Sequence, residues 1–312
     1  MSRARDGETG TFVTVGVFDG VHLGHQDLIL RMVRAARSEG ARTACVTFDP
    51  HPEVVLHPDS YPAPLSTLAD RLNLIRALGV DAVHIVTFTR EVSRESPEQF
   101  VGRLRQQYPM QSLWVGADFA LGHDRAGTVD VLRSIGRGMG FDVVTVPPLE
   151  HDGRPVSSTW IRDALGDGNV ELAMELLGRA YSVGGPVISG MRRGREIGFP
   201  TANIAPPTEL ALPADGVYFV TASFDESSDR VDAREWYGVV NLGPRPTFHE
   251  SERLIETHLL DFSGDLYGAQ MAVRFLRRLR GVQTFSGIGE LRAQIARDVS
   301  AAREFASESH PR

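Results

Sequence analysis

The sequence predicts two domains of different class: a doubly wound α/β domain with a parallel sheet, and then a small antiparallel β-barrel with a C-terminal helix. The 312 residues exceed the usual size of one compact domain. Up to about residue 180, apolar β-branched runs alternate with helical patterns, which is typical of a parallel sheet. Beyond Tyr181, short β segments separated by Gly and Pro replace the helical periodicity, which favours a closed barrel.

The first half begins with a buried strand at residues 11–18 and a helix that ends at Gly40. The apolar run 41–48 is the next strand, so these elements form a βαβ unit with a right-handed crossover. The pattern then predicts helices at 68–79, 96–108 and 129–138, strands at 82–88, 112–116 and 141–146, and two short helices at 158–168 and 169–178. We therefore expect domains at residues 1–180 and 181–312.

The second half contains short β segments that suit a barrel. They span residues 181–188, 216–224, 236–242, 255–262 and 272–279. The polar stretch 225–235 is predicted to be an exposed hairpin loop. An amphipathic helix at about 288–304 is expected to pack on the outside of the barrel.

The composition excludes several classes of function. A net charge of −7 argues against nucleic-acid binding. No apolar run is long enough for a membrane span and no secretory signal is evident, so we expect a cytoplasmic protein without membrane partners. All 33 cationic residues are arginine, which excludes chemistry that needs a Walker-A, Schiff-base or kinase lysine. Cys45 is predicted to be a core residue, and the oligomeric state is left open.

The segment "VGVFDGVHLGH", residues 15–25, indicates a phosphate site where the first strand passes into a helix. Its three glycines, at positions 16, 20 and 24, allow the backbone to approach a ligand closely. His22 and His25 lie three residues apart at the helix start, so both imidazoles can reach one phosphate. The alternative is that both histidines are turn and cap residues.

This segment resembles the HxGH nucleotidyltransferase superfamily, and three more segments extend the match. They are "TFDPHP" (47–52), "VGADFALGHDRAG" (115–127) and "VSSTWIR" (156–162), in the order seen in the FMN adenylyltransferase half of bacterial bifunctional riboflavin kinase/FAD synthetases. The resemblance implies catalytic roles for His22, His25 and Arg162. It implies ATP contacts at Gly16, Phe18, Asp19, Gly24, Ser158 and Thr159, and flavin contacts at His51, Asp118 and Phe119.

Three positions in these segments have open alternatives. His51 could equally be a loop cap. Leu121 departs from the family, which usually carries an aromatic residue there. His123–Arg125 could contact a ligand or form a solvated loop.

The segment "SGMRRGREIGFPTANI", residues 189–204, indicates a second site for an anionic ligand, because a glycine-arginine loop precedes an extended stretch. Thr201 and Asn203 alternate on that stretch and could bind one metal ion, with substrate phosphates and water completing the coordination.

"GFPTAN" resembles the signature of riboflavin kinase, and "LPADGVY", "VVNLGPRPTF" and "ETHLLDFSGDLYG" follow in order. The resemblance implies that Glu256 is the general base on the ribityl 5′-hydroxyl, although such a residue alone could be a solvated strand glutamate. It implies Mg²⁺ at Thr201 and Asn203. The implied ATP and flavin contacts are Gly190, Gly194, Arg195, Gly198, Pro200 and Asn241.

The two resemblances together imply two ATP-dependent reactions that need Mg²⁺: phosphorylation of riboflavin to FMN, and adenylylation of FMN to FAD with release of pyrophosphate. One alternative is a monofunctional riboflavin kinase whose first domain only binds nucleotide or flavin. Another is a flavin-storing or regulatory protein without turnover. The formation of FMN and FAD from riboflavin separates the three.

Overall fold

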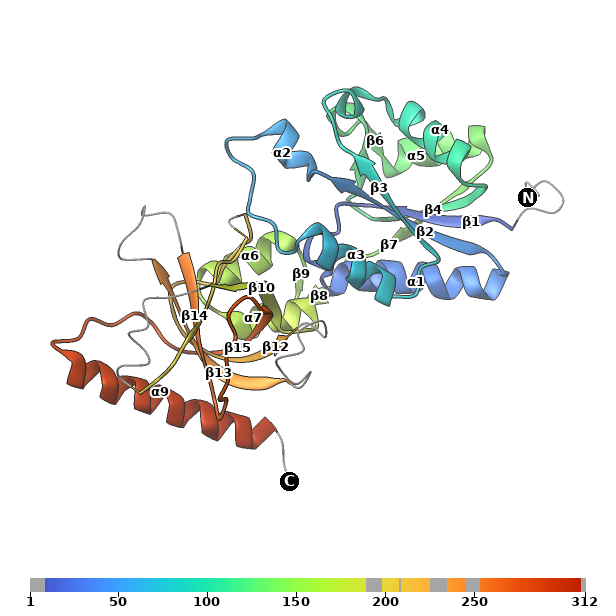
Figure 1. Cartoon of the computed structure of the whole chain (residues 1–312). Coiled ribbons are helices and arrows are strands. Elements are labelled where there is room, and N and C mark those ends of the chain that lie inside the picture. The colour runs from blue at the N-terminus through green and yellow to red at the C-terminus, as the bar shows by residue number, and fades with distance from the viewer. Residues whose placement is uncertain (1–8, 189–197, 208, 225–234, 245–252, 310–312) are drawn as a thin grey trace. The chain divides into compact units, whose positions relative to one another are not determined.

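The computed structural model divides the chain into two compact units, Met1–Ser158 and Thr159–Arg312 (Figure 1). It describes residues 9–188, 198–207, 209–224, 235–244 and 253–309. Both predicted fold classes are confirmed: a parallel α/β sheet in the first unit and a closed antiparallel barrel in the second. Among the described residues, no helix is both long enough and apolar enough to cross a membrane.

The first unit is built on a five-stranded sheet with the order β3-β2-β1-β4-β7, in which every pair of neighbours is parallel. The strands are β1 (Thr11–Val15), β2 (Arg42–Asp49), β3 (Ala82–Thr87), β4 (Met110–Gly116) and β7 (Asp142–Val146). The chain winds outward from β1 through β2 to β3, and then crosses to β4 on the other side of β1. The strand order therefore reverses between β1 and β4, and open α/β sheets bind ligands at the carboxyl ends of the strands at such a point.

Helices cover both faces of this sheet. They are α1 (Leu23–Glu39), α3 (Leu68–Ala77), α4 (Pro97–Gln107) and α5 (Val129–Met139). The short α2 (Pro52–Leu56) follows β2 and has no buried residue. α1 and α3 lie on one side and α4 and α5 on the other (Figure 1). Val13 faces the α4–α5 side, and Cys45 is buried in the cluster with α1 and α3, as predicted for a core residue.

Short elements in the loops of the first unit were not predicted, because they are too brief to show periodicity. They are α2, the hairpin of β5 (Ala120–Leu121) with β6 (Gly127–Thr128), the hairpin of β8 (Glu150–His151) with β9 (Arg154–Pro155), and three 3₁₀ turns at η1 (Asp19–Val21), η2 (Val92–Arg94) and η3 (His123–Arg125). Two of these elements, η1 and the β5–β6 hairpin, lie in segments that carry predicted site residues.

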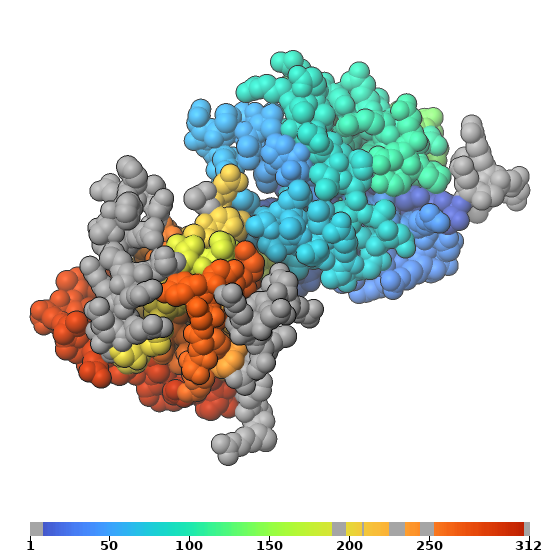
Figure 2. Space-filling view, viewed as in Figure 1, coloured from blue at the N-terminus to red at the C-terminus, as the bar shows by residue number. Residues whose placement is uncertain are grey.

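The second unit is a six-stranded barrel closed in the order β10-β11-β14-β13-β12-β15. The strands are β10 (Tyr181–Ile188), β11 (Ala202–Ile204), β12 (Gly216–Phe224), β13 (Trp236–Pro244), β14 (Arg253–Leu259) and β15 (Gln270–Arg280). Helix α9 (Ile288–Ser309) packs on the barrel as predicted, because Ala302 and Phe305 meet Val217 and Phe219 of β12. In the space-filling view its red side chains lie at the surface (Figure 2).

Two short helices, α6 (Ser158–Gly166) and α7 (Val170–Leu177), fall with the barrel, since the division into units comes after Ser158. The amide of Ala214 donates to the carbonyl of Leu165 at 2.8 Å, and Arg278 of β15 donates to the carbonyl of Asp167 at 2.8 Å. These contacts fix the α6–α7 turn to the barrel. The functional division between residues 180 and 181 stays a prediction.

Candidate active sites

The loop between β1 and α1 has an unusual backbone. Phe18 and Val21 adopt left-handed conformations with φ of 53° and 41°, and Gly20 has φ of 71°. A left-handed conformation is costly for non-glycine residues, above all for a β-branched valine, and it persists only where the surroundings enforce it. We call residues 16–25 the HxGH segment. Its strained backbone is the kind found at functional sites.

Hydrogen bonds from outside the HxGH segment hold this backbone in place. The carboxylate of Asp19 accepts from the amide of Leu65 at 2.9 and 3.1 Å, and the hydroxyl of Ser66 accepts from the amide of Gly20 at 3.2 Å. The hydroxyl of Ser158 donates to the carbonyl of Asp19 at 3.0 Å. Asp19 is buried, so its side chain positions the loop, and its predicted contact with ATP stays a prediction.

Arg71 is a buried cation behind the HxGH segment that sequence reasoning missed. It is 5% exposed, and its guanidinium donates to the carbonyls of Val17 at 3.1 Å and Phe48 at 2.9 Å. Burial lowers the pKa of Arg71, whereas the carboxylates of Asp19 and Asp49 raise it. The guanidinium stays charged at neutral pH. The one available signal was the position of Arg71 four residues before the apolar Ile75 on the same helix face.

His22 and His25 form a stacked pair at the start of α1. Their ring centroids lie 3.6 Å apart, and His22 caps the helix because its Nδ1 accepts from the amide of His25 at 3.4 Å. A neutral imidazole that accepts at Nδ1 carries its proton on Nε2, so His22 retains an Nε2–H donor. A side chain at Gly24 would start 3.2 Å from the His22 ring, so the glycine makes room for that ring. The cap alternative is therefore true of His22, and it leaves the ring able to donate.

His25 is held in the neutral form. Burial, and secondly the neighbouring His22, lower the pKa of His25 well below its usual value. Its Nδ1 is buried without a hydrogen-bond partner among the described residues, and the ring meets the edge of Phe18 at 5.2 Å between centroids. His25 thus offers a neutral imidazole at the carboxyl end of β1, stacked on the ring of His22 that caps the helix.

The segment after β4 forms a pocket at the same edge of the sheet. The predicted flavin residues Asp118 and Phe119 line this pocket of about 370 Å³ together with Arg125 and Thr128. Leu121, the departure from the family, is buried in the core and does not line the pocket. We call this cavity the β4 pocket. The pocket segment follows β4, and the HxGH segment follows β1. Because β1 and β4 are paired neighbours, both segments leave the same edge of the sheet.

The remaining predicted residues of the first site lie in two other places. His51 caps α2, because its Nδ1 accepts from the amide of Glu53 at 3.1 Å, and its flavin contact stays a prediction. Ser158, Thr159 and Arg162 lie on the first turns of α6, which begins at Ser158. Ser158 joins the HxGH segment through Asp19. The predicted phosphate contacts of Thr159 and Arg162 stay predictions.

In the barrel, strand register brings three predicted residues together. Glu256 of β14 lies directly opposite Asn203 of β11 on one side and opposite Asn241 of β13 on the other. Opposed residues of antiparallel strands point to the same face, with Cβ atoms about 5 Å apart. Glu256 is half-buried, Asn203 is buried and Asn241 is exposed. These three side chains form a polar row across the barrel surface.

His258 extends this row and was missed by sequence reasoning. Its Nδ1 donates to the carbonyl of Pro200 at 2.8 Å, and its ring meets the edge of Phe199 at 5.5 Å between centroids. It thereby fixes the "FPT" stretch, which includes the predicted Pro200, beside Glu256. The available signal was the spacing of two residues from Glu256, which places both on one face of a strand. Gly198 is described, whereas Gly190, Gly194 and Arg195 lie outside the described residues.

The residues predicted to bind a metal differ in exposure. The Oδ1 atom of Asn203 is buried and has no hydrogen-bond partner among the described residues, whereas Thr201 is exposed just before β11. A buried carbonyl oxygen without a donor is costly unless a ligand satisfies it. An amide oxygen is a hard ligand that suits Mg²⁺, so Asn203 fits the predicted role. Within the described ranges, no three acidic, His or Cys side chains cluster as metal ligands.

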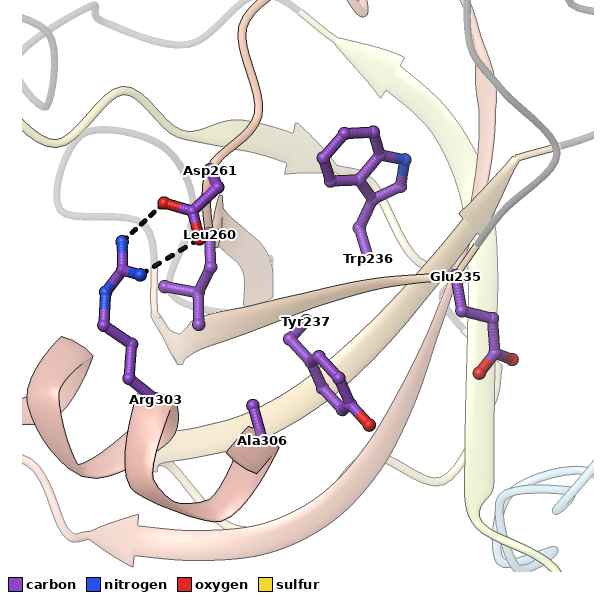
Figure 3. Close-up of a pocket in the computed structure, with 7 residues that line it drawn as sticks. All are labelled: Glu235, Trp236, Tyr237, Leu260, Asp261, Arg303 and Ala306. Carbon is purple, nitrogen blue, oxygen red and sulfur yellow. Dashed lines mark hydrogen bonds and ion pairs between the residues drawn. The ribbon is translucent and has the colours of Figure 1, made fainter. Parts of the chain in front are cut away.

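A second pocket, of about 330 Å³, lies where the start of β13, the end of β14 and α9 meet (Figure 3). Trp236, Tyr237 and Leu260 line it, and Arg303 closes one side through paired hydrogen bonds to Asp261 at 2.7 and 3.0 Å. None of the predicted site residues lines this pocket.

Comparison with known proteins finds a family model for each half of the chain. The FAD synthetase family model matches residues 5–160, and the riboflavin kinase family model matches residues 177–306. The bifunctional riboflavin kinase/FMN adenylyltransferase of Pseudomonas fluorescens is 37% identical over 99% of this chain and 97% of its own length. The protein of the same name from Bacillus subtilis is 36% identical over 97% of this chain and 95% of its own length.

Among solved structures, a Streptococcus pneumoniae protein described as a macrolide-efflux protein matches with a TM-score of 0.85 and 30% identity. That match covers 95% of this chain and 94% of the other. The two family models occur in one chain, and the relatives that carry both activities align over nearly all of it, so the monofunctional alternative is not favoured. The chain belongs to the family of bifunctional riboflavin kinase/FMN adenylyltransferases and is a transferase for riboflavin, FMN and ATP.

Proposed function

We propose that FMN is adenylylated in the first unit, with ATP at the HxGH segment and the flavin in the β4 pocket. The observation that carries this assignment is the His22–His25 pair at the carboxyl end of β1, beside the point where the strand order reverses. The backbone after β1 is strained and held by Asp19 and Arg71, which supports a preorganised phosphate site.

In this reaction an oxygen of the FMN phosphate bonds to the α-phosphorus of ATP. The bond from that phosphorus to the bridging oxygen breaks, and pyrophosphate leaves. The Nε2–H of His22 donates to the phosphate oxygens as their charge grows, and the neutral ring of His25 supports it through the stack. Ser158, Thr159 and Arg162, at the start of α6, contact the triphosphate.

For the kinase reaction we propose that Glu256 accepts the proton of the ribityl 5′-hydroxyl. The hydroxyl oxygen then bonds to the γ-phosphorus of ATP, and ADP leaves. The polar row of Asn203, Glu256 and Asn241 supports this assignment, because it places a carboxylate between two amides on one face of the barrel. His258 holds the carbonyl of Pro200 beside the row and so orders the residues that lead into β11.

Mg²⁺ would be held by Asn203 Oδ1 and Thr201 Oγ1 together with the phosphates of ATP. When bound, it neutralises phosphate charge in the transition state. The buried and unpartnered oxygen of Asn203 supports this site. We place the enzyme in the cytoplasm, where ATP and the flavoproteins that use its products are made.

The test is a product assay. The chain is incubated with ATP, Mg²⁺ and riboflavin, and FMN and FAD are resolved by chromatography; matched reactions receive excess chelator. We expect FMN first and FAD later, with both lost in chelator. FMN without FAD would refute the adenylyltransferase assignment, and undiminished products in chelator would refute the role of Mg²⁺.

A further inference from the structure

The β4 pocket has an uneven charge distribution. Arg125 is the one cation among the described residues that line it, whereas two carboxylates, Asp118 and Asp130, also face it. Asp130 is engaged by Arg133 at 3.0 Å, and the carboxylate of Asp118 lies back against Gly116, where an added Cβ would be 3.3 Å from its Oδ1. Among the residues that the structure describes, no direct ion pair therefore neutralises the charge of Arg125 inside the pocket.

The backbone holds Arg125 at the pocket wall. Asp124 and Arg125 are consecutive non-glycine residues with left-handed φ values of 50° and 56°, a costly arrangement in the turn η3. The amide of Arg125 donates to the carbonyl of Gly122 at 3.1 Å, and η3 is closed by the pairing of β5 with β6. The direction in which this side chain leaves the backbone is thus fixed by the fold.

The guanidinium itself has spare capacity. Among the described residues it makes one hydrogen bond, from a terminal nitrogen to the carbonyl of Asp118 at 3.3 Å. A guanidinium carries five N–H donors in a planar fork that matches phosphate oxygens two at a time. Most of that fork remains available for an anion, and the bond to Asp118 O ties it to the residue beside Phe119.

We propose that Arg125 is the residue by which the adenylyltransferase site recognises the 5′-phosphate of FMN. The flavin ring packs on Phe119, and the phosphate reaches the fork of Arg125. This rests on the proposed function of the β4 pocket as the flavin site. Riboflavin and FMN share the ring and differ by this phosphate, so a cation in the pocket selects the flavin that can react. It also offsets repulsion between two anions, the FMN phosphate and the ATP triphosphate, as they approach.

The experiment measures FAD formation from supplied FMN in the full chain with Arg125→Ala, Arg125→Lys and a matched control, Arg105→Ala. Arg105 is an exposed arginine of the same unit, on α4. Loss of a charge-assisted hydrogen bond predicts a rise of about 10- to 100-fold in the KM for FMN in Arg125→Ala. The KM for ATP stays within twofold of that of the unsubstituted chain, and so does the rate of FMN formation from riboflavin. Arg125→Lys keeps the charge without the planar fork, so its KM for FMN lies between those of the unsubstituted chain and Arg125→Ala. Arg105→Ala has the KM of the unsubstituted chain.

A second readout separates recognition of phosphate from collapse of the pocket. Lumiflavin has the ring without the ribityl phosphate, and its inhibition of FAD formation stays unchanged in Arg125→Ala. A KM for FMN within twofold of the unsubstituted value overturns the proposal, and so does a joint weakening of FMN and lumiflavin. Phe119→Leu tests the underlying site: it weakens both flavins if the pocket binds the ring. If it changes neither, the assignment of the β4 pocket fails rather than that of Arg125 alone.

Discussion

The imidazole of His22 stacks on that of His25 with 3.6 Å between ring centroids. Nδ1 of His22 also accepts a hydrogen bond from the backbone amide of His25. One side chain therefore caps the helix and orients its neighbour. Because Nδ1 of His22 accepts this bond, the ring nitrogen that can donate is Nε2.

His25→Ala is expected to lower FAD formation by about two orders of magnitude or more, as loss of a charge-stabilising group can. FMN formation should be nearly unchanged, because the barrel carries the kinase residues. Both rates are measured in one preparation, with FMN supplied for the first and riboflavin for the second. Survival of FAD synthesis within a few-fold would show that His25 is a structural residue.

The depressed pKa of His25 predicts a pH dependence of stability. The folded ring stays neutral, whereas in the unfolded chain it binds a proton below about pH 6.5. Below that pH the unfolded state binds more protons than the folded state. The contribution of His25 to the free energy of unfolding is therefore complete only above about pH 6.5. It falls by up to about 1.4 kcal/mol per pH unit below it, until the folded pKa is reached. The free energy of unfolding, measured with urea at pH 7 and pH 5, should change less between the two pH values in His25→Asn than in the unsubstituted chain. An equal change in both proteins would contradict the lowered pKa of His25.

Arg71→Met should destabilise the first unit, because it removes a charged donor from the carbonyls of Val17 and Phe48. The carbonyl of Val17 keeps its bond from the hydroxyl of Thr47 at 2.9 Å. We expect a loss of about 2–4 kcal/mol in the free energy of unfolding. FAD formation should fall at least about tenfold through misplacement of the loop. Arg76→Met, at an exposed position of the same helix, is the control and should change neither quantity.

Glu256→Gln should reverse the pattern of His25→Ala. Glutamine keeps the size and much of the hydrogen bonding but cannot accept the proton, so riboflavin phosphorylation should fall about 10²- to 10⁴-fold. The KM values for riboflavin and ATP should shift much less, since the interaction is realised in the transition state. FAD synthesis from supplied FMN should persist. Undiminished kinase turnover would remove Glu256 as the base.

Two fragments should differ in stability. Residues 158–312 retain α6 and α7, whereas residues 181–312 lose Leu165, Leu176 and Leu177, all fully or almost fully buried. Exposing the barrel surface beneath them should lower the melting temperature by about 10 °C or more, given the usual shift per kcal/mol in domains of this size. The longer fragment should phosphorylate riboflavin. Equal melting temperatures would show that the two helices are not part of the kinase unit.

Strands and long helices could be predicted from the sequence because their signals are local: β-branched runs, helical spacing and caps such as Ser96 before α4. The grouping of α6 and α7 could not be predicted, because it depends on Arg278, which reaches a carbonyl 111 residues away in the chain. Motif residues such as His22 and Glu256 could be proposed as site residues from the sequence, whereas the signal for Arg71 was only its place on the helix face of Ile75. An arginine in a helical pattern predicts a solvated face, and its burial is explained by the carbonyls of Val17, after β1, and of Phe48, near the end of β2.

Arg71 also connects two segments of the first site, the HxGH segment after β1 and the end of β2 that leads to His51. Its single guanidinium holds the carbonyl of Val17, in the loop after β1, and that of Phe48, near the end of β2 and three residues before His51. A ligand that pushes on either segment must therefore move the other with it or break a buried charged contact. We therefore expect ligand occupancy at the HxGH segment to be coupled through Arg71 to the conformation of the residues around His51.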